Sequence, residues 1–332
     1  GINVKIITGD SVLTAKAISN QIGLTGKVVT GKELENISKK DLVKLVNETV
    51  IFARTTPQQK LSITQALQSE EETVAITGDG INDVLALKAA DIGIAMGQRG
   101  TDVARDTADV VLIDDNFASI VSGVEEGRKT YDNIRKFTKY MLAVNFSQIV
   151  LILVALLMRL PLPLIPLQIL WLNLLTDSIP ALSLVFEKPE NVMKTKPRKE
   201  KSLLNKTWKF ILGGGIIAFA AEFLVYLLNV MNSMPIEQVR SMVLTTAILF
   251  ELFFVYTCRS EKPLLETGIF SNKWLNYAVL LTLTLQLILI YTPLAFIFGV
   301  APLTLDNWLV ILPFALSGVV IFEIGKYIKH KK

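Results

Sequence analysis

The feature that most constrains this chain is a series of apolar runs in its second part, each close to the length that crosses a lipid bilayer. A membrane-spanning helix needs about 20 predominantly apolar residues. We identify such runs at residues 137–158, 167–186, 208–231, 239–257, 275–298 and 308–327. Prolines and turn residues separate them, for example Pro161, Pro163 and Pro166 between the first two. The sequence therefore predicts an all-α membrane part with six spans in a lipid bilayer.

Charge divides the chain in a similar way. Residues 1–135 contain 15 basic and 19 acidic residues, whereas residues 136–332 contain 19 basic and 11 acidic residues. Charged residues are 19% of the whole chain, against about 25% in a typical soluble domain, so a single soluble globule and a disordered chain are both excluded. With one cysteine, Cys258, and one histidine, His330, the chain cannot form a disulfide scaffold or a metal site built from Cys and His.

Basic residues gather in alternate loops of the membrane part and in its tail. Only Arg159 and Arg240 lie in the intervening loops. This alternation is the positive-inside pattern, which places the basic loops, the C-terminal tail and the N-terminal 135 residues in the cytoplasm, at what we expect to be the cell membrane. The basic residues are Lys188, Lys194, Lys196, Arg198, Lys199, Lys201, Lys206 and Lys209 in one loop, then Arg259, Lys262 and Lys273, and finally Lys326, Lys329, Lys331 and Lys332. For each single lysine, a topology signal and nothing more is the favoured interpretation.

The second span contains polar residues on one helix face. Asn173, Thr176 and Asp177 are spaced i, i+3 and i+4. Pro180 has no N–H to donate to the Thr176 carbonyl, which is therefore predicted to be free as a ligand. A carboxylate, an amide, a hydroxyl and a free carbonyl are oxygen ligands of the kind that hard cations prefer. The alternative is hydrogen bonding between helices, but a charged Asp177 in mid-span favours an ion site.

Other spans add polar residues to this set. Asn145 and Gln148 share a face of the first span, and Glu251 lies in the fourth. We predict that they complete the cation site. For Glu222 in the third span we find no partner, so structural and functional interpretations stay open. Glu323 lies near a span end and is predicted to pair with Lys326.

The first 135 residues show short β-rich apolar runs that alternate with helical stretches, which is typical of a parallel α/β sheet with ligand groups at the carboxyl ends of its strands. The predicted strands are Val4–Thr8, Val50–Ala53, Thr73–Thr77, Ile92–Ala95 and Val110–Ile113.

Two of these strands end in the same tripeptide. Thr8-Gly9-Asp10 follows the first strand, and Thr77-Gly78-Asp79-Gly80-Ile81-Asn82-Asp83 follows the third. Carboxylates at neighbouring strand ends repel one another, and Mg²⁺ would relieve that repulsion. The segment Phe52-Ala53-Arg54-Thr55-Thr56-Pro57-Gln58-Gln59-Lys60 adds a lysine at a helix start. A hydroxyl, a lysine and Mg²⁺-binding carboxylates suit the charge of a transferred phosphoryl group.

These motifs together resemble the C-terminal half of a P-type cation-transporting ATPase. They are TGDGIND, FARTTPQQK, ADIGIAMGQRGTDVARDTADVVLIDDNFASIV and the span segment NLLTDSIPA. The Asn173–Thr176–Asp177 pattern is most similar to calcium pumps of the sarcoplasmic-reticulum type and their bacterial relatives.

The resemblance implies a fold, domains and roles. It implies a partial phosphorylation domain of haloacid-dehalogenase type at 1–117, a stalk helix at 118–139 and a six-helix membrane domain at 140–332. It implies that Asp79 binds Mg²⁺ with Asn82 and Asp83, that Thr8, Gly9 and Asp10 lie at the phosphoryl group, and that Lys60 neutralises it. The implied ligands of the transported cation, Ca²⁺, are Asn145, Gln148, Asn173, Thr176, Asp177 and Glu251.

Departures from the family pattern sharpen these expectations. Gln148 stands where the family usually has Glu, which predicts one transported ion in place of two, or altered selectivity. Val84-Leu85 stands where the family has Ala-Pro, and Ser178 stands where the family usually has Gly. No Asp-Lys-Thr-Gly-Thr occurs, so the phosphorylated aspartate is missing, and we expect the chain alone to be inactive.

Three hypotheses follow. The chain is the C-terminal part of an ATP-driven pump for Ca²⁺, or for another cation such as Mn²⁺ or Na⁺, whose partner is the missing N-terminal portion that binds most of the ATP. Alternatively, it is a truncated membrane protein without turnover. A phosphatase domain tethered to a membrane bundle is excluded, because that chemistry also needs the absent aspartate. No nucleic acid partner is expected.

Overall fold

The computed structural model describes residues 1–188, 192–194, 196–197, 202–205 and 207–331. Its internal contacts divide the chain into two compact units. The first comprises Gly1–Glu126 and Met193–Lys199, and the second comprises Gly127–Val192 and Glu200–Lys332. The basic residues Arg198, Lys199, Lys201, Lys206 and Lys332 of the sequence analysis lie outside the described residues.

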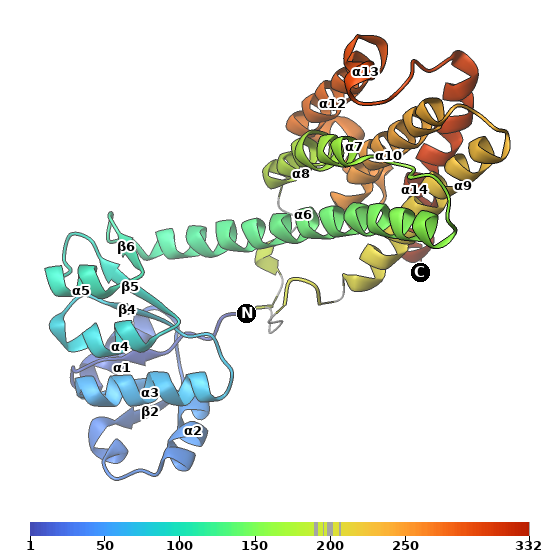
Figure 1. Ribbon diagram of the computed structural model, residues 1–332. Helices are drawn as coiled ribbons and strands as arrows, with labels where there is room; N and C mark the ends of the chain where they lie inside the picture. The colour runs from blue at the N-terminus through green and yellow to red at the C-terminus, as the bar shows by residue number, and fades with distance from the viewer. Residues whose placement is uncertain (189–191, 195, 198–201, 206, 332) are drawn as a thin grey trace. The chain divides into compact units, whose positions relative to one another are not determined.

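The first unit contains two parallel three-stranded sheets (Figure 1). One has the order β1 (Ile6–Ile7), β3 (Thr49–Ala53), β2 (Lys27–Thr30), and the other the order β4 (Ala75–Gly78), β5 (Ile92–Met96), β6 (Val110–Leu112). The prediction of one parallel sheet is therefore wrong in the described residues, although the parallel pairing is confirmed. The strand β2 was not predicted, because its sequence Lys-Val-Val-Thr contains only two apolar residues.

Short helices connect the strands of the first unit, and side-chain caps define where four of the five begin. The helices are α1 (Val12–Gln21), α2 (Lys39–Glu48), α3 (Pro57–Ser69), α4 (Val84–Ala89) and α5 (Asp102–Thr107), of which α4 is the exception. Thr56 caps α3 by accepting from the Gln59 N–H, while Pro57 occupies the first turn, where its missing N–H costs nothing. Phe52 and Ile63 are fully buried in the core that holds α3 against β3. This fixes the orientation of Lys60, which follows the cap.

The helix α6 (Phe117–Leu157) has 41 residues and contains the first predicted span in its second half. Its first ten residues belong to the first unit and the remainder to the second. The apolar run of the sequence is thus the end of a much longer helix.

Six helices of the described residues are long and apolar enough to cross a membrane, which confirms the number predicted. Besides α6 they are Pro166–Phe186, which includes α7 (Pro166–Trp171) and α8 (Ser178–Ser183), and then α9 (Trp208–Met231), α10 (Ile236–Cys258), α12 (Lys273–Tyr291) and α14 (Leu305–His330). The fifth span is shorter than predicted, because the helix ends at Tyr291 before Pro293, and α13 (Leu294–Ile297) is separate. The remaining helix is α11 (Leu264–Thr267).

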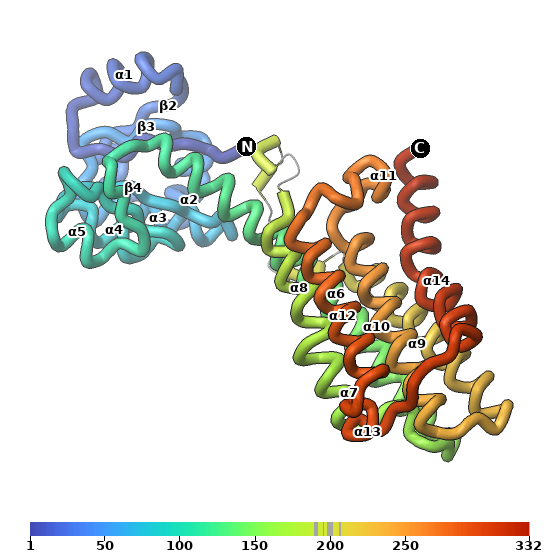
Figure 2. The backbone as a smooth tube through the Cα atoms, turned by 90° about the horizontal axis from the view of Figure 1, so that it is seen from above, coloured from blue at the N-terminus to red at the C-terminus, as the bar shows by residue number. Residues whose placement is uncertain are grey.

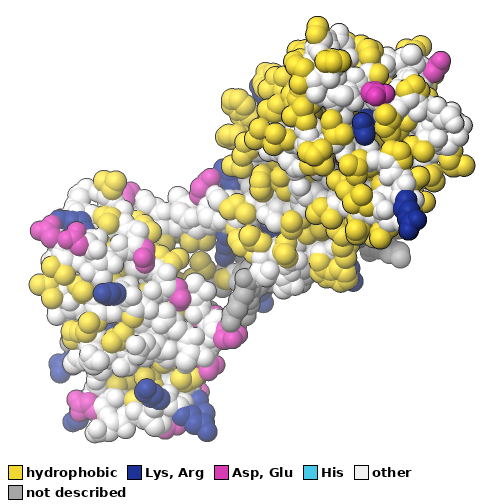
Figure 3. Space-filling view, in the orientation of Figure 1, with side chains coloured by type: hydrophobic (Ala, Val, Ile, Leu, Met, Phe, Trp, Pro, Cys, Tyr) yellow, Lys and Arg dark blue, Asp and Glu magenta, His cyan; other side chains and the backbone are white. Residues whose placement is uncertain are grey.

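The helices of the second unit run side by side, with α10 the most enclosed (Figure 2). In the most apolar window of α10, 89% of residues are buried, whereas the corresponding value for α14 is 17%. Apolar side chains cover much of the surface of this unit (Figure 3). Such a surface suits lipid rather than water.

Close packing of α9 against α6 depends on glycine. A Cβ at Gly215 would lie 2.5 Å from Cδ1 of Phe146 and 2.8 Å from the Ala143 carbonyl oxygen. Lipid tails are as apolar as the helices, so helices in a bilayer associate through such close contacts of small residues. This contact holds α9 beside the stretch of α6 that leads to Gln148.

Candidate functional site

The loop after β1 is held against the loop after β3. The backbone N–H and the hydroxyl of Thr55 both donate to the Thr8 carbonyl, each at 3.0 Å, and the Arg54 N–H donates to the Asp10 carbonyl at 2.9 Å. Thr55 is buried, whereas Gly9 and Asp10 are exposed. The first Thr-Gly-Asp tripeptide and Arg54-Thr55 therefore lie side by side, with Gly9 and Asp10 on the exposed edge.

The second tripeptide is joined to Lys60. The ammonium of Lys60 lies 2.5 Å from Oδ1 of Asp83, and both side chains are largely buried. The loop from Asp79 to Asp83 folds back so tightly that a Cβ at Gly78 would lie 2.5 Å from Cβ of Asp83. The helix α3 thus delivers its lysine to the loop after β4, as a phosphoryl site requires.

The acidic residues of this edge are only partly gathered. Among the described residues no three His, Cys, Asp or Glu side chains lie close enough to hold a metal ion. Asp83 is already paired with Lys60, whereas Asp79 and Asn82 are exposed at the end of β4. These two side chains offer the oxygen atoms that Mg²⁺ prefers, and further ligands have to come from elsewhere.

A buried polar cluster joins three helical segments of the second unit. The amide nitrogen of Gln148, on α6, donates to Oε1 of Glu251, on α10, at 3.2 Å and to Oδ2 of Asp177 at 3.5 Å. The amide of Asn173 donates to the Gln148 oxygen at 3.3 Å. Asp177 is 0% exposed and Glu251 is 1% exposed. The structure thus brings together four of the six residues that the sequence predicts as ligands.

The backbone of the second span is irregular at this cluster. Residues Leu172–Thr176 form a π-helical turn, and the Asp177 N–H donates to the Leu172 carbonyl at 2.9 Å. The hydroxyl of Ser178 donates to the Asn173 carbonyl at 2.7 Å. Single π turns inside α-helices are frequent at functional sites. Together with Pro180, this turn interrupts the regular hydrogen bonding beside Asp177.

Two carboxylate oxygens of the cluster, Oδ1 of Asp177 and Oε2 of Glu251, are buried and have no hydrogen-bond partner among the described residues. Buried polar atoms of native proteins are almost always bonded, and an unpaired buried charge is costly. Carboxylate and amide oxygens are ligands for hard cations. The cluster therefore has the composition and the unsatisfied oxygens of a cation site.

Two predicted ligands make no hydrogen bond to the cluster within the described part of the chain. The amide of Asn145 donates to the Met141 carbonyl at 2.8 Å, and the hydroxyl of Thr176 donates to the Leu172 carbonyl at 3.1 Å. Both side chains bond to their own helix, an option that short polar side chains always have.

The structure supplies a partner for Glu222 that the sequence analysis missed. The hydroxyl of Ser147 lies 3.2 Å from Oε1 of Glu222, and both residues are buried. The sequence signal for this pair was the position of Ser147, which directly precedes Gln148. The predicted pair of Glu323 and Lys326 is confirmed at 2.7 Å.

Comparisons with known proteins match both units. The family described as "Cation transporting ATPase, C-terminus" matches residues 161–328, and the family described as "haloacid dehalogenase-like hydrolase" matches residues 1–91. The chain is 41% identical over 341 residues to a calcium-transporting ATPase of Bacillus subtilis, which covers all of this chain and 38% of that relative. It is 39% identical to calcium-transporting ATPase 1 of Bacillus cereus, over 99% of the chain and 40% of the relative.

A eukaryotic relative extends the pattern. The human calcium-transporting ATPase type 2C member 1 is 37% identical over all of this chain and 37% of its own length. The chain thus spans about two fifths of the length of these relatives.

Proposed function

This chain belongs to the P-type cation-transporting ATPases, and from that membership we propose that it forms the C-terminal part of a pump that uses ATP to move Ca²⁺ across a membrane. Ca²⁺ is favoured over Mn²⁺ and Na⁺ because the relatives above are named calcium-transporting ATPases. The chain is a multi-pass membrane protein with six spanning helices in its described part. The positive-inside pattern supports a cytoplasmic first unit and C-terminal tail, at the cell membrane.

The observation that carries the proposal is the buried contact of Gln148 with Asp177 and Glu251. We assign the transported cation to the unpaired oxygens of the two carboxylates, with Asn173 and Gln148 as amide ligands. The side chains of Asn145 and Thr176 would join after rotation, because each now bonds to its own helix. The Thr176 carbonyl would join after a local rearrangement of the backbone.

We further propose that a single Ca²⁺ is transported in each cycle. Two carboxylates of the cluster balance the charge of one divalent cation, and the third side chain between them, Gln148, is neutral. A second divalent ion in the same cluster would leave buried positive charge without compensation.

The first unit, which is haloacid-dehalogenase-like, would handle the phosphoryl group. Lys60 supplies positive charge beside the loop of Asp79, and the exposed edge of Thr8, Gly9 and Asp10 would contact the phosphoryl group. Asp79 and Asn82 would hold Mg²⁺, with Asp83 as a further ligand after it releases Lys60, and Mg²⁺ when bound offsets the charge of the phosphoryl oxygens. The sequence contains no Asp-Lys-Thr-Gly-Thr, so the phosphorylated aspartate and most ATP contacts would come from an N-terminal portion of the pump.

The test uses a full-length pump that contains this sequence, purified and reconstituted in vesicles. Asp177→Asn is expected to abolish Ca²⁺-dependent phosphorylation and Ca²⁺ uptake, because it removes one of the two carboxylate charges. Glu237→Gln, a change at an exposed position on the helix that also carries Glu251, serves as the matched control. Mn²⁺ and Na⁺ are added as competitors. Unchanged Ca²⁺ dependence in Asp177→Asn would disprove the site, and uptake of Mn²⁺ or Na⁺ in preference to Ca²⁺ would disprove the ion.

A further inference from the structure

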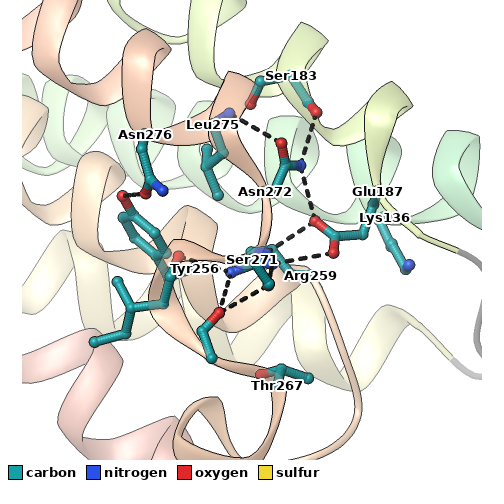
Figure 4. A network of polar contacts seen from close by, with 12 residues as sticks. Lys136, Ser183, Glu187, Tyr256, Arg259, Thr267, Ser271, Asn272, Leu275 and Asn276 are labelled. Carbon is teal, nitrogen blue, oxygen red and sulfur yellow. Dashed lines mark hydrogen bonds and ion pairs between the residues drawn. The ribbon is translucent and has the colours of Figure 1, made fainter.

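A buried ion pair joins the ends of the two helical segments that carry Asp177 and Glu251. The Nε atom of Arg259 donates to Oε2 of Glu187 at 2.8 Å, and its Nη2 atom donates to Oε1 at 3.1 Å (Figure 4). Arg259 is 1% exposed and Glu187 is 8% exposed. Glu187 follows Asp177 by ten residues, and Arg259 follows Glu251 by eight. The pair therefore connects both segments at the same end.

Every N–H of the Arg259 guanidinium has an acceptor. Beyond the two bonds to Glu187, Nη1 donates to the carbonyls of Gly268 and Ile269 at 3.1 and 3.3 Å, and Nη2 donates to the Ser271 hydroxyl. A lysine has only three N–H donors and no planar fork, so it could not satisfy this set. The arrangement fixes the end of α10 in both position and rotation.

Two asparagines extend the connection to further helices. Asn272, which caps α12, donates to Oε2 of Glu187 at 2.9 Å and to the Ser183 carbonyl at 3.2 Å. Asn133, on α6, donates to the carbonyls of Val185 and Glu187 at 2.9 and 3.1 Å. We call Asn133, Glu187, Arg259 and Asn272 the Glu187 network. It ties together all three segments that contribute to the polar cluster, since α6 also carries Gln148.

Glu187 carries a negative charge at neutral pH. Burial alone would raise its pKa, but hydrogen bonds from Arg259 and Asn272 and the positive charge of Arg259 outweigh burial and lower the pKa below its ordinary value. The pair is thus a directional, charge-assisted contact. A helix that slides along its neighbour by one residue moves about 1.5 Å, which breaks such a bidentate bond but changes apolar packing against lipid much less.

We propose that Glu187 and Arg259 are positioning residues for the cation site, which hold the second span, α10 and α6 in the register that keeps Asp177, Glu251 and Gln148 together. The inference rests on the proposed function, since it gives the network a role in cation affinity. Neither residue contacts the cluster directly in the described hydrogen bonds. Their effect passes along two turns or more of helix, so they act on the ligands by fixing the position and rotation of the helices that carry them.

The experiment uses the full-length pump and compares Glu187→Gln, Arg259→Gln and the double variant. Lys329→Gln is the matched control, because Lys329 pairs with Glu261 at 3.8 Å while both side chains are 83% exposed. The readouts are the Ca²⁺ concentration for half-maximal ATP hydrolysis, the maximal rate and equilibrium binding of radioactive Ca²⁺. We expect the half-maximal Ca²⁺ concentration to rise about tenfold in each single variant, with little change in maximal rate. The double variant should not exceed the worse single variant, since each change breaks the same pair.

A purely structural role predicts different data. Loss of folded protein or of maximal rate, with unchanged half-maximal Ca²⁺ concentration in the folded fraction, would overturn the proposal. If the charge variants do not fold, Asn133→Ala removes the link to α6 together with a 3.4 Å hydrogen bond from Lys136 within α6, and leaves the pair of Glu187 and Arg259 in place. It should still weaken Ca²⁺ binding, and an unchanged affinity there overturns the proposal as well. Asp177→Asn, measured in parallel, separates the two levels: its loss of Ca²⁺ activation preserves the proposed function even when the network variants bind Ca²⁺ normally.

Discussion

The amide nitrogen of Gln148 lies 3.2 Å from Oε1 of Glu251, so a neutral side chain of α6 donates to a buried carboxylate of α10. The same nitrogen also donates to Asp177, so the amide of Gln148 bridges oxygens of two carboxyl groups. A cation bound to the two carboxylates requires a ligand oxygen at the position where the Gln148 nitrogen lies. Gln148 can therefore bond to one oxygen of each carboxylate without the cation and, after its amide turns, coordinate the cation through Oε1.

Gln148→Glu tests this arrangement. The change removes the only donor between Asp177 and Glu251 among the described hydrogen bonds and adds a third buried carboxylate. We expect the Ca²⁺-free pump to lose about 3–5 kcal/mol of stability, and Ca²⁺ to raise its melting temperature by more than it raises that of the wild type. Thermal unfolding with and without Ca²⁺ measures both effects, with Gln65→Glu at an exposed position as control. An equal response to Ca²⁺ in variant and wild type would contradict the arrangement.

Lys60→Gln removes the charge that faces Asp83 at 2.5 Å. If Lys60 neutralises the phosphoryl group, the rate of phosphorylation from ATP should fall by about 100-fold to 1,000-fold, as for the loss of other electrostatic contacts to a developing charge. Rapid-quench measurement of the phosphorylated full-length pump gives this rate. Lys16→Gln, on the exposed side of α1, controls for loss of a surface lysine. A normal rate in Lys60→Gln would remove Lys60 from the phosphoryl site.

Glu222→Gln should leave the affinity for Ca²⁺ unchanged. Glutamine keeps an acceptor for the Ser147 hydroxyl, and the described residues contain no group of three acidic side chains close enough to bind one metal ion. Equilibrium Ca²⁺ binding to the full-length variant checks this expectation. A clear loss of affinity would instead show that Glu222 contributes its charge to the cation site.

Gly215→Val should destabilise the second unit by about 1–3 kcal/mol, the usual effect of overpacking. The added side chain would meet the Ala143 carbonyl, a backbone atom that cannot rotate away, and the Phe146 ring. Gly213→Val is the matched control two residues earlier, because a Cβ there has only Phe322 Cζ within 4 Å, at 3.7 Å. The melting temperatures of the two full-length variants should differ, and equal values would contradict the close approach of α9 and α6.

Asp115 provides a prediction on pH. Its carboxylate accepts from the N–H of Gln98 at 2.9 Å and from the N–H of Arg99 at 2.8 Å, and these bonds lower its pKa below the ordinary 3.8. A lowered pKa stabilises the fold above the ordinary value and loses that effect as pH falls through the lowered one. Asp115→Asn, which tolerates the positive φ of 51° at this position, should therefore accelerate amide exchange at residues 98–99.

The size of that effect, expressed as the ratio of protection factors in wild type and variant, should be the same at about pH 8 and about pH 5. A ratio that changes strongly between these two pH values would mean that another group dominates this loop.

The parts of the fold that depend on local sequence were predictable. Spanning length is a property of each apolar run, so the six membrane helices follow from the sequence, and the spacing of Asn173 and Asp177 places them together on any helical turn. The family resemblance followed from contiguous motifs and is confirmed by the matches over both units.

Features that depend on contacts between distant residues were not predictable. Glu187 and Arg259 are 72 positions apart, and each alone is an ordinary charged residue near a span end. The bond of Asn145 to Met141 is a choice between side-chain rotamers that spacing does not determine. The division into two sheets depends on which strands pair, and β1 has only two residues with which to pair.

The π-helical turn at Leu172–Thr176 has a consequence for how this segment can vary in evolution. A π turn accommodates one residue more than an α turn, so deletion of a single residue there would restore a more regular helix. Because the wider turn already accommodates the extra residue, the helix beyond it would keep its orientation, whereas a deletion in the regular part of the span would rotate everything beyond it by about 100°. We therefore expect a one-residue deletion to be tolerated at this turn and excluded from the regular part of the span, because only the former leaves Asp177 facing Gln148.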